Sequence, residues 1–75
     1  MTIGQNIKKF RLAKGMTQEQ LAEVMDVTHG AVSLWESDDR SMNIKQADKL
    51  ATALGVTLND LMRDTISIQE ELDRR

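Results

Sequence analysis

Residue pairs with the spacing of helix N-terminal capping boxes constrain the fold of this chain more than any other feature. In a capping box, the cap side chain and the residue three positions later satisfy each other's backbone N–H groups, so each pair marks a helix start. The pairs are Thr17 with Gln20, Asn43 with Gln46, and Ser67 with Glu70, and Thr57 with Asp60 is a looser version. The chain has no Pro, and only residues 65–68 alternate as a strand does. The pattern therefore predicts an all-α protein.

Apolar residues fall on one face of each segment between these marks and define five helices. The first is expected over about residues 3–14. The second starts at the Thr17 cap, the third at Thr28, the fourth at the Asn43 cap and the fifth at the Thr57 cap. The residues expected to face the core are Ile3, Ile7, Phe10, Leu21, Ala22, Met25, Ala31, Val32, Trp35, Ile44, Ala47, Leu50, Ala51 and Leu54. Gly15 and Gly55 each follow a helical stretch, where a left-handed backbone costs glycine little.

The length of 75 residues is half of the roughly 150 residues allotted to one domain, which indicates a single domain. A chain this short buries only about 62% of its unfolded surface, which favours a partner that shares the burial. The absence of Cys and the single His argue against a disulfide framework and a zinc site. The apolar runs are far shorter than the roughly 20 residues of a membrane helix, and no signal segment follows Met1. We therefore expect a cytoplasmic protein without membrane contact.

The net charge of −2 does not exclude nucleic acid as a partner, because the charge is unevenly distributed. Residues 1–35 carry four basic and three acidic groups, whereas residues 36–75 carry six basic and nine acidic groups. A DNA-binding face needs local positive charge rather than a basic total. Charge alone therefore does not identify the partner.

The second and third expected helices are separated by only about three residues, and so short a turn forces two helices to cross steeply. Residues 17–36, TQEQLAEVMDVTHGAVSLWE, resemble the helix-turn-helix of the phage repressor and Cro family of DNA-binding proteins. The similarity extends over about residues 3–62 and includes Arg11 upstream, the pair Trp35-Glu36 and the closing run ALGV at 53–56. The resemblance implies a compact five-helix domain over residues 1–64.

The chain departs from the family pattern at three turn positions. Asp26 and Asp38 stand where family members usually carry Gly, and Met42 stands where they usually carry Pro. Both aspartates are expected to have a left-handed backbone, which Asp tolerates better than most residues at a cost of about 1 kcal/mol relative to Gly. The segment 37–41 is therefore where we expect the largest difference from the family backbone.

The resemblance assigns two sets of residues to a DNA contact. The phosphate contacts fall to Arg11, Thr17, Gln18, Arg40, Ser41, Asn43 and Lys45, and the base contacts fall to Thr28, His29, Gly30, Ser33 and Leu34. A helix N-terminus such as that at Gln18 suits an anion through its dipole and its free N–H groups. The base-contact set lacks Arg, Lys, Asn and Gln, which pair bidentately with bases. An ordinary solvated face is therefore the alternative for both sets.

Arg11 and Glu36 match a pair that, in the family, bridges the first helix to the end of the third, and its expected role is to orient the third helix. A buried ion pair is poor evidence of net stability, although breaking one side is costly. Ser33 and His29 lie one helical turn apart, but no third group orients the imidazole and no oxyanion donors are evident. We therefore expect no enzyme activity, no metal or other cofactor and no small-molecule ligand.

The end of the chain is expected to form a dimer interface. Its large apolar residues are Leu58, Leu61, Met62, Ile66, Ile68 and Leu72. Residues 65–75 are read as an extension that continues the fifth helix, starts a separate helix at Ser67 or pairs as a strand, and the sequence does not decide among these. A frayed terminus is the alternative. A two-fold dimer places two third helices about 34 Å apart, which matches a palindromic operator.

These features together predict a homodimeric regulator that binds double-stranded DNA with its third helix in the major groove. The alternative is a protein-interaction module that has kept the fold and lost DNA binding, which the weakly polar base-contact set and the acidic total favour. The sequence does not distinguish an activator from a repressor, or a phage repressor from a restriction-modification controller or an antitoxin.

Overall fold

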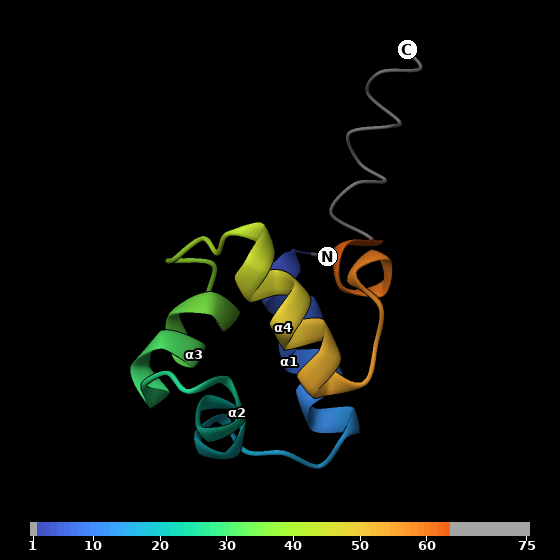
Figure 1. The fold of residues 1–75 in the computed structure, drawn as a ribbon. Helices are drawn as coiled ribbons and strands as arrows, with labels where there is room; N and C mark the ends of the chain where they lie inside the picture. The colour runs from blue at the N-terminus through green and yellow to red at the C-terminus, as the bar shows by residue number, and fades with distance from the viewer. Residues whose placement is uncertain (1, 64–75) are drawn as a thin grey trace.

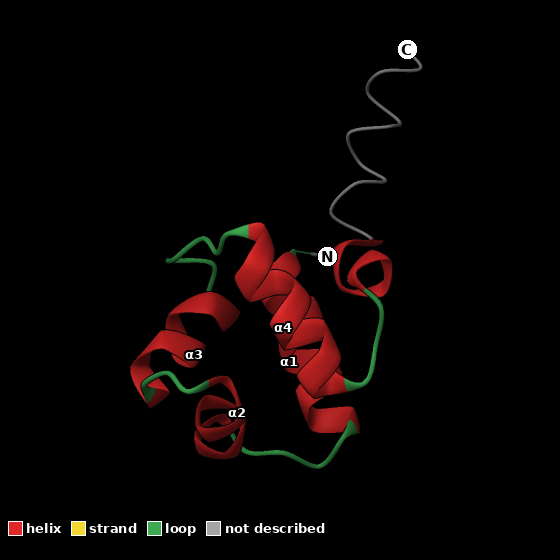
Figure 2. Cartoon of the chain, viewed as in Figure 1, coloured by secondary structure: helices red, strands yellow, loops and turns green. Residues whose placement is uncertain are grey.

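The computed structural model describes residues 2–63, which fold into helices joined by short loops (Figure 1, Figure 2). In chain order these are α1 (Ile3–Ala13), α2 (Gln18–Met25), α3 (His29–Glu36) and α4 (Ile44–Leu54), followed by a helical segment at 58–63. Within residues 2–63 there is no strand. The predicted all-α fold of five helices is confirmed, whereas the Ser67–Glu70 pair and the extension at 65–75 lie outside the described residues.

Side-chain caps start α2, α3, α4 and segment 58–63 where the sequence indicates. Thr17 and Asn43 form complete capping boxes at α2 and α4. Thr28 caps α3, because its side chain accepts a hydrogen bond from the Ala31 N–H. The Thr57 hydroxyl and backbone exchange hydrogen bonds with the residue three positions later at the start of segment 58–63. A further capping box at Thr2 starts α1 and is absent from the sequence-based prediction.

The core lies between the four helices and segment 58–63, and Trp35 is its largest side chain, only 2% exposed. The other fully or nearly fully buried apolar residues are Ile7, Leu21, Ala22, Met25, Ala31, Val32, Ala47, Leu50, Ala51, Leu54 and Leu61. Two expectations are wrong here. Ile44 is 75% exposed, because the first turn of α4 borders an open hollow that the neighbouring helices do not fill. Leu61, expected in a dimer interface, is 0% exposed and belongs to the core of the single chain.

Left-handed residues close the turns after the helices. Asp26 has φ 57° and Asp38 has φ 63°, so both aspartates that replace the usual Gly have the expected left-handed backbone. The Asp38 carboxylate also accepts hydrogen bonds from the Gly4 N–H at 3.0 Å and the Thr2 hydroxyl at 2.6 Å. An Asp at this turn thus caps the start of α1 from the end of α3, which Gly cannot do.

The C-terminal end of α3 lies unusually close to α1. A Cβ atom at Gly4 would lie 2.5 Å from the Trp35 carbonyl oxygen and 2.6 Å from that of Glu36, so only Gly fits there. α3 also packs against α2, and α2 packs against α4. In Figure 1, α3 lies on one side of the α1–α4 pair and segment 58–63 on the other. Among residues 2–63, no helix is long and apolar enough to cross a membrane.

Candidate nucleic-acid interface

A buried ion pair joins α1 to the end of α3. Arg11 Nε donates to Glu36 Oε2 at 2.6 Å, and Arg11 Nη2 donates to Glu36 Oε1 at 3.1 Å. The two side chains are only 9% and 5% exposed. Arg11 Nη1 donates to the Met16 carbonyl oxygen at 2.8 Å, which ties the loop before α2 to the same group. This bidentate geometry fixes α3 relative to α1 and to the start of α2.

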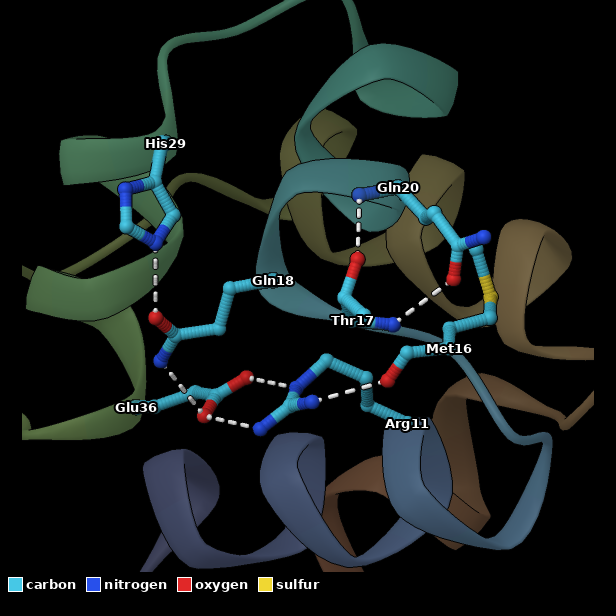
Figure 3. Close-up of polar contacts among 7 residues, drawn as sticks. All are labelled: Arg11, Met16, Thr17, Gln18, Gln20, His29 and Glu36. Carbon is cyan, nitrogen blue, oxygen red and sulfur yellow. Dashed lines mark hydrogen bonds and ion pairs between the residues drawn. The ribbon is translucent and has the colours of Figure 1, made fainter.

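Gln18, the first residue of α2, extends this ion pair to the start of α3. Its Nε2 donates to Glu36 Oε1 at 3.1 Å, and its Oε1 lies 3.0 Å from His29 Nε2. Figure 3 shows the resulting chain of contacts running from Arg11 through Glu36 and Gln18 to His29. We call these four residues the polar relay. Residues of α1, α2 and α3 contribute to it. Through Gln18, the His29 side chain at the start of α3 is linked to the Glu36 carboxylate at the end of the same helix.

An open hollow lies beside the polar relay at the N-terminus of α2. Its lining residues are Arg11, Leu12, Met16, Thr17, Gln18, Glu19 and His29. The first N–H groups of a helix have no intrahelical acceptor, and the helix dipole adds positive potential there. Thr17 satisfies one of those N–H groups through the capping box. The remaining donors at this end of α2 suit an anion, although the Glu19 carboxylate, which also lines the hollow, opposes one.

The face of α3 away from the core is exposed along its length. It carries His29, Gly30, Ser33 and Leu34, and Leu34 is 40% exposed. Thr28, the α3 cap, is exposed beside them. A Cβ atom at Gly30 would meet only the Thr28 hydroxyl oxygen, at 3.9 Å, so packing within this chain does not require Gly there.

The loop between α3 and α4 and the first turn of α4 present uncommitted cationic and polar groups. Arg40, Ser41 and Lys45 are exposed, and their side chains make no hydrogen bond or ion pair with any other residue of the described chain. Asn43 differs, because its side chain accepts from the backbone of α4 as the cap. The nearby Asp39 carboxylate is held by the Ser37 hydroxyl at 2.7 Å.

The structure therefore groups the predicted contact residues into three neighbouring sites: the α2 N-terminus, the outer face of α3, and the following loop with the first turn of α4. Three supporting contacts escaped sequence reasoning. Asp38 caps α1, Lys49 Nζ donates to the Met25 carbonyl oxygen at 3.1 Å, and the buried Asn6 donates to the Leu61 carbonyl oxygen at 2.8 Å. Their partners are 24 to 55 positions away in sequence, so no local pattern reveals them. In residues 2–63, no cluster of three potential metal ligands occurs.

This chain is similar in sequence to known helix-turn-helix regulators. A family model described as helix-turn-helix matches residues 7–61. An uncharacterized HTH-type transcriptional regulator of Rickettsia prowazekii is 42% identical over 52 residues, which cover 69% of this chain and 40% of the relative. The chain spans only about two fifths of the length of several curated relatives that it matches, 37% to 42%.

Two solved structures have closely similar folds. The restriction-modification controller protein C.AhdI from Aeromonas hydrophila is 34% identical, with a TM-score of 0.75 over 79% of this chain and 89% of that one. SinR, the master regulator for biofilm formation, was solved in complex with DNA. It is 31% identical, with a TM-score of 0.76 over 81% of this chain and 98% of the SinR chain.

Proposed function

The chain belongs to the helix-turn-helix family of transcriptional regulators, and from this premise we propose that it binds double-stranded DNA sequence-specifically with α3 in the major groove. The observation that carries the proposal is the exposed outer face of α3, held at both ends by the polar relay. A rigid helix with free outward side chains is what base reading requires, because recognition depends on a fixed register along the groove. The family is one of regulators, not of enzymes.

Phosphate groups are proposed to bind on either side of α3. On one side, the N-terminus of α2 offers its N–H groups, the second N–H of the Gln18 amide and the guanidinium N–H groups that Arg11 does not use within the chain. On the other side, Arg40, Ser41 and Lys45 have no partner within the described chain, and Asn43 lies between them. Two clamps that flank a helix fix its position on the duplex without reading sequence.

Base edges are proposed to contact the outer face of α3. Ser33 can hydrogen-bond to any base, and Leu34 can pack on the methyl group of thymine. His29 carries a ring nitrogen into the same surface, and Thr28 borders it. Gly30 allows the backbone to approach DNA closely, since the protein itself leaves room for a side chain there. These contacts are fewer and weaker than bidentate pairs, so we expect modest discrimination at each position.

We further propose that the protein acts as a homodimer on a palindromic site, through an apolar hollow lined by the starts of α1 and α4 and by segment 58–63. The hollow has a volume of about 330 Å³ and is lined by Ile3, Met42, Asn43, Ile44, Ala47, Leu58, Asn59 and Met62. Ile44 at its rim is 75% exposed, which costs free energy in water. The proposed occupant is the extension of a second copy, residues 65–75, whose sequence carries Ile66, Ile68 and Leu72.

Selection from a random DNA library tests the function. The protein should enrich a sequence with two-fold symmetry, and the logarithm of its binding constant should fall against the logarithm of salt concentration with a slope of about −5 to −7, if a dimer meets six to eight phosphates. No enriched sequence at low salt, or a flat salt response, would instead support a protein-interaction module built on the same fold.

A further inference from the structure

The polar relay determines the direction of every hydrogen bond that reaches His29. The Glu36 carboxylate can only accept, so the Gln18 side chain must present its NH₂ group to Glu36 Oε1. The Gln18 carbonyl oxygen Oε1 then faces His29 Nε2 at 3.0 Å. Because that oxygen can only accept, His29 must carry its proton on Nε2. The Glu36 carboxylate thus fixes, through the orientation of one amide, which ring nitrogen of His29 faces an acceptor.

A neutral imidazole with its proton on Nε2 has a bare acceptor at Nδ1. His29 is exposed, and no residue of the described chain hydrogen-bonds to its Nδ1. In Figure 3 this second ring nitrogen lies on the side of the ring turned away from Gln18. In its neutral form, His29 therefore presents an oriented acceptor, not a donor, on the exposed surface at the start of α3.

We propose that His29 presents Nδ1 to the major groove as an acceptor and thereby selects an adenine or a cytosine at the position it meets, an inference that rests on the proposed DNA binding. In the major groove only these two bases carry an exocyclic amino group, N6 of adenine and N4 of cytosine, that can donate to an acceptor. Guanine and thymine present acceptors there, O6 and N7 or O4. An acceptor facing an acceptor leaves both unpaired, so these two bases are rejected.

The test starts from the selected DNA site, with all measurements at pH 8, where a free imidazole is neutral. The selection is repeated with His29→Ala, and the position whose preference relaxes is the one that His29 reads. Wild-type protein should prefer adenine or cytosine there by about 3- to 10-fold, the size of one neutral hydrogen bond. Replacing that adenine by purine, or that cytosine by 2-pyrimidinone, removes only the amino group and should abolish the preference. Every base pair carries one of these amino groups on one of its two strands, so the deletion decides: wild-type affinity that is unchanged when the amino group is removed, or no position that relaxes in His29→Ala, overturns the proposal.

Gln18→Ala separates the relay from the histidine itself. Without the amide, the imidazole can turn or place its proton on Nδ1, so discrimination at the His29 position should fall below about 2-fold, the lower end for one hydrogen bond. Gln20→Ala is the matched control, because Gln20 is on the same helix and, within residues 2–63, its side chain hydrogen-bonds only to the Thr17 backbone N–H. It should leave the discrimination intact. Unchanged discrimination in Gln18→Ala shows that the relay does not orient His29.

The ring nitrogens can also be observed directly in the free protein, because His29 is the only histidine. Nitrogen-15 NMR at pH 8 should show a protonated Nε2 and an unprotonated Nδ1, and Gln18→Ala should shift both signals toward the average of two tautomers. This result is independent of DNA. A failed selection with the expected NMR signals therefore rejects the proposed function and the base preference with it but keeps the relay, whereas a proton on Nδ1 rejects the inference alone.

Discussion

Two surfaces of this small domain differ in how completely contacts within the chain pair their polar groups or cover their apolar side chains. At the junction of α1, α2 and α3, the polar relay occupies both oxygens of Glu36 and both ends of the Gln18 amide. At the hollow beside α4, Ile44 remains 75% exposed with apolar neighbours that cover it only in part. The first surface is complete before any partner arrives and serves positioning. The second is incomplete, and we propose that a second copy covers it.

The largest effect is expected from breaking the polar relay at Glu36. Glu36→Ala leaves the buried Arg11 guanidinium without its carboxylate and should lower the free energy of unfolding by about 3–5 kcal/mol. Urea titration followed by Trp35 fluorescence measures it. Glu23→Ala, on an exposed turn of α2, is the control and should change stability by less than about 0.5 kcal/mol. A small loss in Glu36→Ala would show that the pair contributes little to holding α3.

The apolar hollow can be broken without unfolding the domain. Ile44→Lys places a charge at the proposed interface on a side chain that is already largely exposed, so the dimer should weaken at least about tenfold, which is 1.4 kcal/mol, while the monomer keeps its unfolding midpoint. Sedimentation velocity over a concentration series measures the association. Val24→Lys, on α2 and 55% exposed, should leave it unchanged. Equal association in the two variants would place the interface elsewhere.

A truncation after Arg63 tests the other half of that interface. Removal of residues 64–75 takes away Ile66, Ile68 and Leu72, so a folded monomer with buried Trp35 is expected, with operator affinity reduced at least about tenfold because only one half-site is held at a time. Sedimentation and Trp35 fluorescence are measured on the same sample. If the truncated protein still dimerises, the interface must instead be formed by the hollow and its lining residues Leu58 and Met62.

Asp38 tests how contacts within the chain position α3, since its carboxylate links α3 to α1. Asp38→Ala removes the cap on α1 and also places Ala in a left-handed backbone, so a loss of about 2 kcal/mol is expected. Asp38→Gly removes the same cap but relieves the backbone, so it should lose about 1 kcal/mol less. Thermal unfolding of the pair separates the two contributions. Equal losses would mean that backbone strain at residue 38 is negligible.

The smallest effect is expected at Gly30, where the fold and the function make opposite demands. Ala fits the space beside Thr28, so Gly30→Ala should stabilise the domain by up to about 1 kcal/mol through helix propensity. The same methyl group should weaken DNA binding if the backbone approaches the duplex there. Unchanged DNA affinity alongside increased stability would remove Gly30 from the interface.

Local chemistry explains which parts of the structure were predictable from the sequence. The starts of α2, α3 and α4 follow from Thr17, Thr28 and Asn43, because a cap depends only on residues three positions apart. The left-handed aspartates follow from the family resemblance. The α1 cap supplied by Asp38 does not, because it joins residues 34 and 36 positions apart.

Two errors have the same origin. Ile44 fits the apolar stripe of α4, so periodicity predicts that it is buried in the core. Leu61 fits the apolar stripe of the chain end, so periodicity groups it with the residues of the expected dimer interface. Their exposure depends on what packs against each turn, which periodicity does not contain. Asn6 holds the Leu61 backbone against α1, and an open hollow borders Ile44. The exposure of Ile44 and the burial of Leu61 both depend on how separate helices pack together.

The central claim is that the outer face of α3 reads base edges, and a repeat of the DNA selection with Ser33→Ala and Leu34→Ala tests it most directly. Each variant keeps the polar relay and the phosphate clamps, so both should still bind DNA with the same salt dependence. The enriched sequence should change at positions placed symmetrically in the two half-sites, since contacts to bases specify sequence and contacts to phosphate do not. Enrichment of the wild-type sequence by both variants would contradict the claim.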